Sequence, residues 1–599
     1  MILFLNFDII AEENEKGRYV PREWKLQQIL EAQGKTNNPG ASLLESDENT
    51  KISKSNEVES EVHAAINPND TNNIIVSPIR QGGAEGLYCP IYFTTDFGAS
   101  WQESSFKALP KGEGQAAGGG DPILVFDDNG RAHLSWIHLW MNGQIFQADT
   151  IIASLYYAYS DDGGTSWNED PEYITETRYH IDMPFAPQFS LKQMSDKQWM
   201  CADRSDAESK NYVYTTVTEI DMSGSSEDYN IMLHRLKPGD TEFESNIVNA
   251  NQYDMLQFST CAVDNNGRLH VMFYGKKGGN AVYYTYSDDG GANFIPEIKI
   301  SDFHSTIPVG EHGNAPDSIK GITNQRFYPA PMLTCDNSGG PNGGNLYAVW
   351  TADGIDQKES NGYDIYLSRS TDRGETWQQP IIVNDDQKGV RSSQFYPSIT
   401  VNGRGVVIIS WYDRRMDESD LLTEYYISYS FDGGETFPVQ MPVSSAASDF
   451  TSIGARNNGF GIGEYNQLLA TDYYAIPVWG DGRDNQGDVS IYTAFVPISE
   501  GVSSVDEIKP VNSSVSIRSI SPQPANGQIE LRLSLKHGSA VDVSFYNING
   551  GKLPYGQNWN LGAGEHNMSI NTSMLKAGSY YLKVLTSSGY ALKKFIITR

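Results

Sequence analysis

Arginines near the ends of predicted strands are the side chains of this chain best suited to binding an anion. They are Arg80, Arg204, Arg326, Arg391, Arg414, Arg415 and Arg483. A guanidinium group pairs bidentately with a carboxylate or sulfate group. The chain is otherwise acidic, because 599 residues carry 44 Lys+Arg against 75 Asp+Glu, a net charge of −31. Arginines gathered in such a protein predict recognition of an acidic group, such as one on a glycan.

The overall charge also excludes classes of partner. A nucleic acid and an anionic membrane surface both need basic residues to neutralise their charge. No nucleic-acid partner is therefore expected. No run of apolar residues is long enough to span a bilayer, so no membrane-spanning segment is expected either.

An eight-residue motif, Ser/Thr-x-Asp-x-Gly-x-x-Trp/Phe, occurs five times and defines the elements that must position these side chains. Its copies are Thr94–Trp101, Ser160–Trp167, Ser287–Phe294, Ser370–Trp377 and Ser430–Phe437. Its aspartates are Asp96, Asp162, Asp289, Asp372 and Asp432. Each aspartate can accept hydrogen bonds from N–H groups of its own turn, and the glycine permits a positive φ. The motif predicts a hairpin between two strands, with a structural role for its aspartates.

Upstream of the motifs lies a second repeated pattern, two apolar strands joined by a turn such as Asp-Asn-Gly. It occurs at residues 63–79, 123–136, 189–202, 261–274, 331–350, 399–412 and 468–480. The two patterns predict seven four-stranded units of about 63 residues each within residues 58–498. Such units repeated radially make an all-β fold, the β-propeller. Either an N-terminal strand closes the seventh unit, or the first and last units share one blade and leave six; we favour seven.

In a propeller the first strand of each blade lines the central channel. The loops before this strand and after the second strand open on one face, and the motif hairpins lie on the other. Function is carried by loops on a rigid scaffold. Besides the arginines, the first face should present Glu61, His63, Asp121, Asp182, Tyr253, Tyr328, Tyr396, Glu464, Tyr465, His138, Trp140, Lys276, Asp353, Asp203, Asp413 and Asp481. We expect the site among these residues.

The five motifs match the Asp-box, and their setting resembles the sialidase-like, BNR-repeat propeller superfamily over roughly residues 60–497. The superfamily includes sialidases, other glycosidases, polysaccharide lyases and non-catalytic receptors. In sialidases three arginines bind the substrate carboxylate, a tyrosine paired with a glutamate is the nucleophile, and an aspartate is the acid/base. The resemblance assigns these roles to Arg326, Arg391 and Arg414, to Tyr465 with Glu464, and to Asp121.

Several features depart from that resemblance. The Arg-Ile-Pro signature of sialidases is absent, and the nearest stretch, SPIRQGG (77–83), reverses its order. Neighbouring strand residues point to opposite faces, so Glu464 and Tyr465 meet only where the chain is irregular. Repeated Trp-Asp-Arg-like segments also predict local braces, at Asp203–Arg204, Asp413–Arg414 and Asp481–Arg483. A sialidase-like hydrolase of an anionic sugar therefore stands beside two alternatives, a non-catalytic adhesin that binds glycan or protein and a polysaccharide lyase.

The C-terminal residues differ in charge and pattern from the rest. Residues 509–599 hold ten basic and three acidic residues, a net +7 that leaves −38 for the remainder. Their short alternating runs predict a small antiparallel β-sandwich. The stretches 519–533, 543–553 and 575–599 resemble the type A C-terminal sorting domain of the type IX secretion system of Bacteroidota. The resemblance implies export by that machinery, then removal of the tail with release or surface attachment; the alternative is an accessory glycan-binding sandwich.

The expected organisation is a leader or extension at 1–57, the propeller at 58–498, a linker at 499–513 and the sorting domain at 514–599. The apolar residues 1–10 are open to interpretation as a signal-peptide remnant. Four scattered cysteines predict neither a disulfide framework nor a zinc site. No cofactor or catalytic metal is expected, although the Asp-Asn-Gly turns resemble parts of calcium loops and leave a structural calcium as an alternative.

Overall fold

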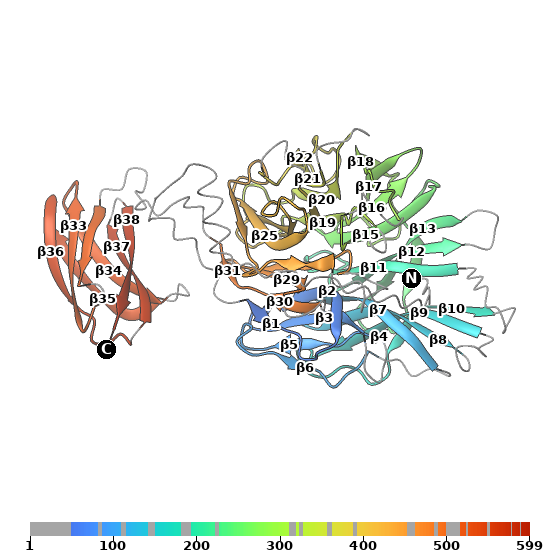
Figure 1. Ribbon diagram of the computed structural model, residues 1–599, viewed down its shortest axis with the longest axis horizontal. Coiled ribbons are helices and arrows are strands. Elements are labelled where there is room, and N and C mark those ends of the chain that lie inside the picture. The colour runs from blue at the N-terminus through green and yellow to red at the C-terminus, as the bar shows by residue number, and fades with distance from the viewer. Residues whose placement is uncertain are drawn as a thin grey trace. The chain divides into compact units, whose positions relative to one another are not determined.

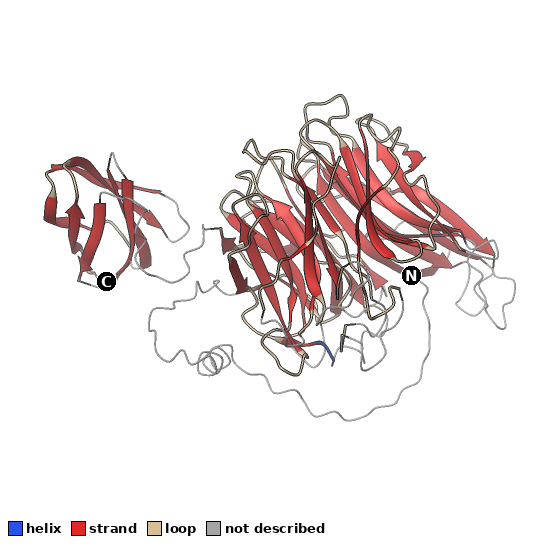
Figure 2. Cartoon of the chain, turned by 90° about the horizontal axis from the view of Figure 1, so that it is seen from above, coloured by secondary structure: helices blue, strands red, loops and turns tan. Residues whose placement is uncertain are grey.

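The computed structural model shows an all-β chain, in which strands form the regular structure of two compact units (Figures 1 and 2). It describes residues 49–81, 87–108, 115–141, 150–180, 193–221, 227–310, 319–322, 327–355, 362–386, 392–451, 462–483, 489–498, 515–522, 525–547, 552–576, 578–586 and 589–598. The first unit holds the described residues up to 498, and the second holds those from 515 onward.

The described residues of the first unit form seven antiparallel sheets of four or five strands. The first sheet holds β2 (Val58–Ile66), β3 (Ile74–Gln81), β4 (Leu87–Tyr88), β5 (Tyr92–Thr94) and β6 (Gln102–Glu103). The second holds β7 (Gln115–Phe126), β8 (Ala132–Met141), β9 (Thr150–Ser160) and β10 (Glu172–His180), and the third β11 (Gln193–Ala202), β12 (Val213–Asp221), β13 (Asp228–Leu236) and β14 (Glu244–Ile247). The fourth holds β15 (Met255–Val263), β16 (Leu269–Lys276), β17 (Asn280–Ser287) and β18 (Ile298–Asp302), and the fifth β19 (Met332–Cys335), β20 (Leu346–Ala352), β21 (Asp364–Ser370) and β22 (Ile381–Ile382). The sixth holds β23 (Gln394–Val401), β24 (Val407–Asp413), β25 (Leu422–Ser430), β26 (Val439–Pro442) and β27 (Ser448–Asp449), and the seventh β28 (Gln467–Ala470), β29 (Tyr474–Asp481), β30 (Ser490–Thr493), β31 (Val496–Pro497) and β1 (Thr50–Lys51).

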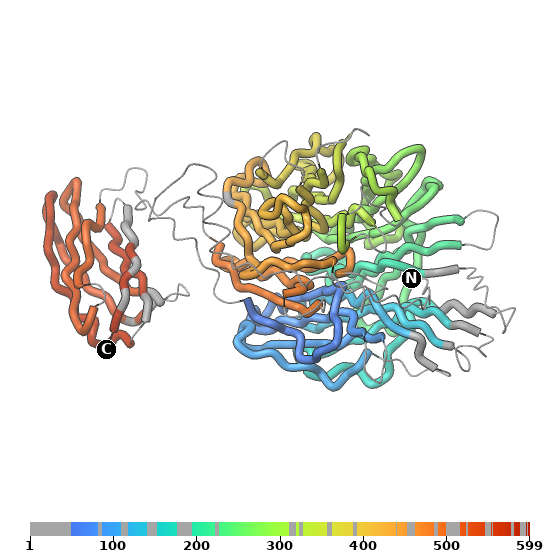
Figure 3. Tube along the Cα trace, viewed as in Figure 1, coloured from blue at the N-terminus to red at the C-terminus, as the bar shows by residue number. Residues whose placement is uncertain are grey.

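The first strands of the sheets form a closed ring. Consecutive first strands β2, β7, β11, β15, β19, β23 and β28 contact one another in that order, and β28 contacts β2. The chain runs around the ring sheet by sheet (Figure 3). Apolar side chains pack between neighbouring sheets; one such cluster joins Ile75 of the first sheet to Trp136 of the second. This radial arrangement is a β-propeller.

The N-terminal strand β1 completes the seventh sheet. Thr50 and Lys51 pair with Thr493 and Tyr492 of β30. The next residue, Ile52, is fully buried and donates its N–H to the carbonyl oxygen of Ile491 at 2.8 Å. The ring is therefore closed by a strand far away in sequence, the first of the two alternatives considered above. The sequence pattern begins only at residue 58 because a strand of two residues has no periodicity.

The third sheet corrects the interpretation of residues 189–202 as two strands joined by a turn. Gln193–Ala202 form the single strand β11, and the register shift between Asp196 and Trp199 shows a bulge where the turn is expected. A polar Ser-Asp-Lys segment is compatible with a bulge as well as with a turn, so composition alone does not distinguish one strand from two. As a consequence, Asp203 and Arg204 follow a first strand and lie at the face of the motif hairpins.

Each copy of the repeated motif forms the turn between a third and a fourth strand. In Ser370–Trp377, the N–H and hydroxyl of Thr376 donate to the two carboxylate oxygens of Asp372 at 2.9 and 2.6 Å. The N–H of Gly374 donates to Ser370 Oγ at 2.8 Å. The other four copies repeat these bonds with their own residues. The aspartates are thus engaged in local turn bonds.

The fixed glycine of the motif also lets neighbouring sheets approach closely. The five glycines are Gly98, Gly164, Gly291, Gly374 and Gly434, and their φ values lie between +81° and +94°. A Cβ on Gly374 in the fifth sheet would overlap the hydroxyl of Tyr284 in the fourth, and one on Gly98 would overlap Phe495. The residue must therefore be glycine for two reasons, backbone conformation and contact with the preceding sheet.

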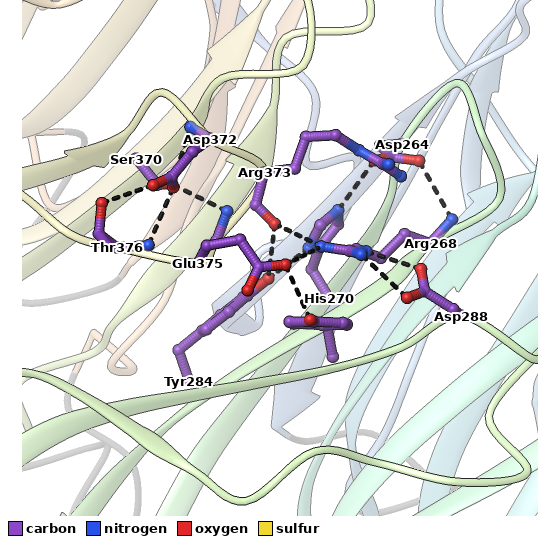
Figure 4. A network of polar contacts seen from close by, with 12 residues as sticks. Asp264, Arg268, His270, Tyr284, Asp288, Ser370, Asp372, Arg373, Glu375 and Thr376 are labelled. Atoms are coloured by element: carbon purple, nitrogen blue, oxygen red, sulfur yellow. Dashed lines mark hydrogen bonds and ion pairs between the residues drawn. The ribbon is translucent and has the colours of Figure 1, made fainter.

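A polar brace joins the fourth and fifth sheets at the same turns (Figure 4). Arg373 of the motif donates from Nε to Asp264 Oδ2 at 2.7 Å. Arg268 pairs with Asp288 at 2.7 Å and reaches Glu375 of the next sheet at 3.1 Å. The motif turns therefore bind the turns between first and second strands of the preceding sheet, which stiffens the face on which both lie.

The second unit is a small β-sandwich with its own core. One sheet holds β32 (Val515–Ser521), β33 (Gln528–Leu535) and β36 (Gly564–Asn571), and the other β35 (Lys552–Leu561), β34 (Ser539–Asn547), β37 (Gly578–Thr586) and β38 (Gly589–Ile597). Residues alternate along β33 between buried and exposed, so its apolar side chains face inward. Leu531, Val543 and Phe595 belong to one cluster between the two sheets.

Candidate functional site

A bulge interrupts most of the first strands at equivalent places. The residues with positive φ there are Glu61 (50°), Asp121 (52°), Lys197 (53°), Phe258 (55°), Ala330 (46°) and Tyr396 (52°). Register shifts accompany five of them. Because Phe258 and Ala330 carry no reactive group, the bulge belongs to the architecture. What changes around the ring is the side chain that each bulge presents.

Three acidic side chains surround one lysine at these bulges. The Nζ atom of Lys197 lies 3.0 Å from Glu464 Oε2, 3.3 Å from Glu61 Oε2 and 3.4 Å from Asp121 Oδ1. All four side chains are less than a tenth exposed. We call these four residues the carboxylate–lysine cluster. It gathers residues of the first, second, third and seventh sheets, and its acidic groups outnumber its single ammonium.

Burial and neighbouring charge separate the proton affinities of the cluster. Burial, together with Asp121 and Glu464, raises the pKa of Glu61 well above its usual value in spite of Lys197. Burial opposes ionisation of Asp121 as well, but Lys197 and the hydrogen bond with Glu61 outweigh it and lower the pKa of Asp121 to about 2. Burial also opposes the charge of Lys197, yet the carboxylates hold its pKa well above the usual value. Glu61 therefore holds its proton more tightly than Asp121 does.

Aromatic side chains enclose the cluster. The hydroxyl of Tyr465 donates to Asp121 Oδ1 at 3.2 Å, and burial followed by the charge of Asp121 raises the pKa of this phenol. The ammonium of Lys197 lies 5.2 Å from the ring centroid of Tyr465 and 5.3 Å from that of Phe258. The ring of Trp199 meets that of Tyr465 edge to face. These rings exclude water and strengthen each charge interaction inside.

The structure brings four of the residues expected at this face together, Glu61, Asp121, Glu464 and Tyr465, with different pairings. Asp121, Glu464 and Tyr465 all reach the cluster, because the chain around Gly463 (φ 80°) is irregular and both residues that follow turn inward. Glu464 binds Lys197, however, and the carboxylate that contacts Tyr465 is Asp121. The tyrosine–carboxylate pair is therefore Tyr465–Asp121 and not Tyr465–Glu464.

The structure describes one member of the expected arginine triad, Arg414. Arg326 and Arg391 lie outside the described residues. Arg414 is fully buried and donates to Thr423 Oγ1 at 2.9 Å and to two carbonyl oxygens, those of Asp420 at 2.8 Å and Lys320 at 2.6 Å. Its nitrogens are used within the protein, so it does not offer a fork to a substrate carboxylate.

The predicted Asp–Arg braces are correct for one pair of three. Arg483 binds Asp481 at 2.6 Å. Asp413 pairs with Arg415 at 2.7 Å instead of Arg414, because consecutive residues point in opposite directions. The carboxylate of Asp203 accepts from the N–H of Ser205 and the hydroxyl of Ser209, and no hydrogen bond or ion pair joins it to Arg204 among the described residues.

Sequence reasoning missed Lys197, the centre of the cluster. The signal was present, because a lysine beside Asp196 interrupts an otherwise strand-like run, but the segment reads equally well as a turn. Within the described part of the chain, no group of three or more His, Cys, Asp or Glu side chains is arranged to hold a metal ion. Among the described residues, no helix is long and apolar enough to cross a membrane.

Comparison with known protein families places the second unit. Residues 519–598 match the family described as the secretion system C-terminal sorting domain. This unit is a type IX sorting domain. Its presence indicates that the protein is secreted, or attached to the cell surface, through that system. The basic tail and the acidic remainder of the chain are therefore separate units, the first of which is the sorting domain.

Comparison with solved structures returns matches at low similarity. They include a protein of unknown function from Dyadobacter fermentans, 14% identical over 62% of this chain and 94% of that one, with a TM-score of 0.39. The GH93 α-L-arabinofuranosidase of Fusarium graminearum is 10% identical over 75% and 97%, with a TM-score of 0.38. The Trypanosoma rangeli sialidase is 8% identical over 92% and 87%, with a TM-score of 0.35. Similarities this low carry no information about catalytic residues. A search of curated proteins gave no match.

Proposed function

We propose that this protein is a secreted, glycan-acting propeller that hydrolyses glycosidic bonds at the carboxylate–lysine cluster. The observation that carries the proposal is the hydrogen bond from Tyr465 to Asp121, whose pKa is lowered, beside Glu61, whose pKa is raised. Titratable groups whose environments push their pKa values apart are how acid and base roles are assigned in active sites. A buried cluster with excess acid is costly to maintain, which favours a function for it.

Each group then has a defined task. Asp121 takes the phenolic proton of Tyr465 while the phenolic oxygen attacks the anomeric carbon. Glu61 gives its proton to the departing glycosidic oxygen, which leaves a glycosyl–tyrosine intermediate and a Glu61 carboxylate. That carboxylate next takes a proton from water, and the attack of water on the anomeric carbon releases the sugar while the phenolic oxygen recovers its proton from Asp121. Lys197 keeps Asp121 ionised and in place.

The substrate class rests on residues that the sequence assigns to the same face. Arg326 and Arg391 stay proposed ligands for a substrate carboxylate, since an anionic sugar needs such a partner. The described arginines at this face are paired internally, for example Arg80 with Glu59 at 2.7 Å and Arg415 with Asp413. Neutral glycosides therefore belong in the substrate panel beside sialosides.

The test is turnover of a panel of fluorogenic neutral glycosides and sialosides. Tyr465→Phe and Asp121→Asn should each lower kcat by about a hundredfold or more, because each removes a proton-transfer or nucleophilic role. The matched control is Tyr429→Phe, since Tyr429 is also a buried phenol but lies away from the cluster. Full activity in Tyr465→Phe, with the variant folded, would reject the site.

A second function, glycan binding without catalysis, is favoured by the burial of the whole cluster and by the internal pairing of the described arginines. In that case the cluster has a structural role, and its polar side chains fill the channel. No turnover of any substrate, together with binding on a glycan array, would select this function. A polysaccharide lyase would instead release an unsaturated product that absorbs in the ultraviolet.

A further inference from the structure

A cavity of about 440 Å³ lies on the propeller axis, beyond the bulges. Its walls come from the later halves of the first strands and the turns that follow them, such as Leu124–Phe126, Met332–Cys335 and Gln467–Ala470. Because the first and third strands run in the same direction, this is the end of the channel at which the motif hairpins lie. The cavity is distinct from the carboxylate–lysine cluster. His63 and Trp199 line it, and Trp199 contacts Tyr465 of the cluster's aromatic enclosure.

Arg204 also lines this cavity. It makes no hydrogen bond or ion pair with any described residue, and its side chain is exposed. The other propeller arginines with described side chains all make such bonds: Arg80, Arg131, Arg235, Arg268, Arg369, Arg373, Arg404, Arg414, Arg415 and Arg483. An unpaired guanidinium in a body of net charge −38 is a ready partner for an anion. The lining carboxylate Asp264 is held by Arg373 at 2.6 Å. Asp128, whose charge acts on Arg204, is paired with Lys210 at 2.8 Å.

Two buried polar atoms beside the cavity also have no partner among the described residues. His63 Nδ1 accepts the N–H of Leu124 at 3.1 Å, so the proton of the neutral ring lies on Nε2. Burial lowers the pKa of His63 to about 3, which keeps the ring neutral, and its Nε2–H has nothing to donate to. Gln467 Oε1 is a buried acceptor that likewise has no hydrogen-bond donor among the described residues. Buried polar groups are nearly always satisfied, so these two await a ligand or ordered water.

The volume of the cavity and the chemistry of its lining residues indicate which class of ligand it can bind. Ligand cavities commonly measure about 300–1,000 Å³, and this one falls in that range. Trp199 offers an aromatic surface, His63 a donor, Gln467 an acceptor and Arg204 a positive charge. A sugar presents C–H faces and hydroxyl groups, and a sugar acid adds a carboxylate. We infer that this axial cavity is a binding site for a small sugar acid, with Arg204 on its carboxylate and His63 and Gln467 on its hydroxyl groups.

Calorimetric titration of the full chain tests the inference with glucuronate, N-acetylneuraminate, galactose 6-sulfate and galactose as probes. The two carboxylated sugars should bind saturably and galactose at least about tenfold more weakly, the difference that a charged hydrogen bond makes. Galactose 6-sulfate tells whether the site takes any anion or a carboxylate alone. Binding of neither carboxylated sugar, or equal binding of galactose, would overturn the inference and leave a water-filled channel.

Paired variants locate the binding. Arg204→Gln should weaken sugar acids about tenfold and leave galactose unchanged. Arg404→Gln should change neither, because Arg404 is on an equivalent turn but does not itself line the cavity. His63→Phe should weaken every sugar, and His234→Phe should not, although His234 is equally buried with an unpartnered Nε2. Unchanged affinity in both Arg204→Gln and His63→Phe would place the ligand elsewhere. Asp121→Asn should keep the binding, which separates this site from the proposed catalysis.

Discussion

At the residue scale, the central feature is that four ionisable side chains share one dry site. Removing charged groups from water costs several kcal/mol for each, and their mutual contacts must offset this. Here Lys197 offsets this cost for Asp121 and also contacts Glu464, while burial raises the pKa of Glu61 and so disfavours its charged form. The arrangement explains why a bulge that is merely architectural at Ala330 becomes chemical at Lys197.

Lys197→Met should destabilise the propeller by about 3–5 kcal/mol, since it leaves ionised Asp121 buried without its partner. Adding Asp121→Asn should recover part of this loss, because the unpaired charge is removed. The comparison variant Lys299→Met breaks an exposed pair and should cost less than about 1 kcal/mol. Urea unfolding measures all three. Equal stability of Lys197→Met and Lys299→Met would mean that the cluster is not charged.

Stability should fall as the pH is lowered from about 6.5 toward 4, because several buried histidines are held neutral. Burial lowers the pKa of His63 to about 3 and those of His138 and His234 to about 4. A histidine whose folded pKa lies below its unfolded value stabilises the protein above pH 6.5 and loses that contribution as the pH falls. Each contributes a slope of up to about 1.4 kcal/mol per pH unit. His234→Phe should flatten the slope of unfolding free energy against pH, and an unchanged slope would contradict the assignment.

At the scale of elements, the repeated motif is a spacer between sheets as well as a turn. Its serine or threonine and its aspartate bond the turn, and its glycine brings the turn against the preceding sheet. The same contact recurs from sheet to sheet, with Leu233, Tyr284 and Phe495 as partners. The motif therefore contributes to stability and rigidity, and leaves chemistry to the inner strands.

Gly374→Ala should lower stability by about 2 kcal/mol or more, because it adds left-handed backbone strain to a clash with Tyr284. The control is Gly278→Ala, which has a φ of 70° and open space around it. It should cost about 1 kcal/mol from the backbone alone. Thermal unfolding of the two variants separates the contact from the backbone effect, and equal losses would show that the sheets do not approach as described.

At the scale of the whole molecule, the chain forms two units, and each has its own hydrophobic core. The sandwich core of Val515–Ile597 shares no residue with the propeller clusters. The tail carries +7 and the remainder −38, so loss of the sorting domain leaves a more acidic protein. Export therefore belongs to the second unit, and the proposed action on a glycan to the first.

A chain that ends at residue 498 should keep the propeller's thermal transition within about 2 °C of its value in the full protein, since no core contact is lost. The full protein should show a second transition that the shortened chain lacks. Differential scanning calorimetry tests both, and secretion should be lost together with the sorting domain. A large fall in the propeller transition would show that the two units are coupled.

Local patterns were enough to predict the all-β class, the propeller repeat and the sorting domain. Turn chemistry, strand periodicity and the tail motifs depend on residues close together in the sequence, so they can be recognised without coordinates. The same reasoning placed Asp121, Glu464 and Tyr465 at the channel, because their position on the first strands follows from the repeat.

Only the tertiary structure decided which side chains meet. Ring closure brings Lys197 to Glu61, Asp121 and Glu464 from positions 136, 76 and 267 residues away, and no local pattern encodes such contacts. Successive side chains along a strand point to opposite sides, so Arg414 donates to backbone carbonyl oxygens and Asp413 pairs with Arg415 instead. A bulge in place of a turn moved Arg204 to the other end of the channel, where it lies unpaired. The amino-acid sequence determined the scaffold because repeats are local, and the fold determined the chemistry because the site is assembled from distant strands.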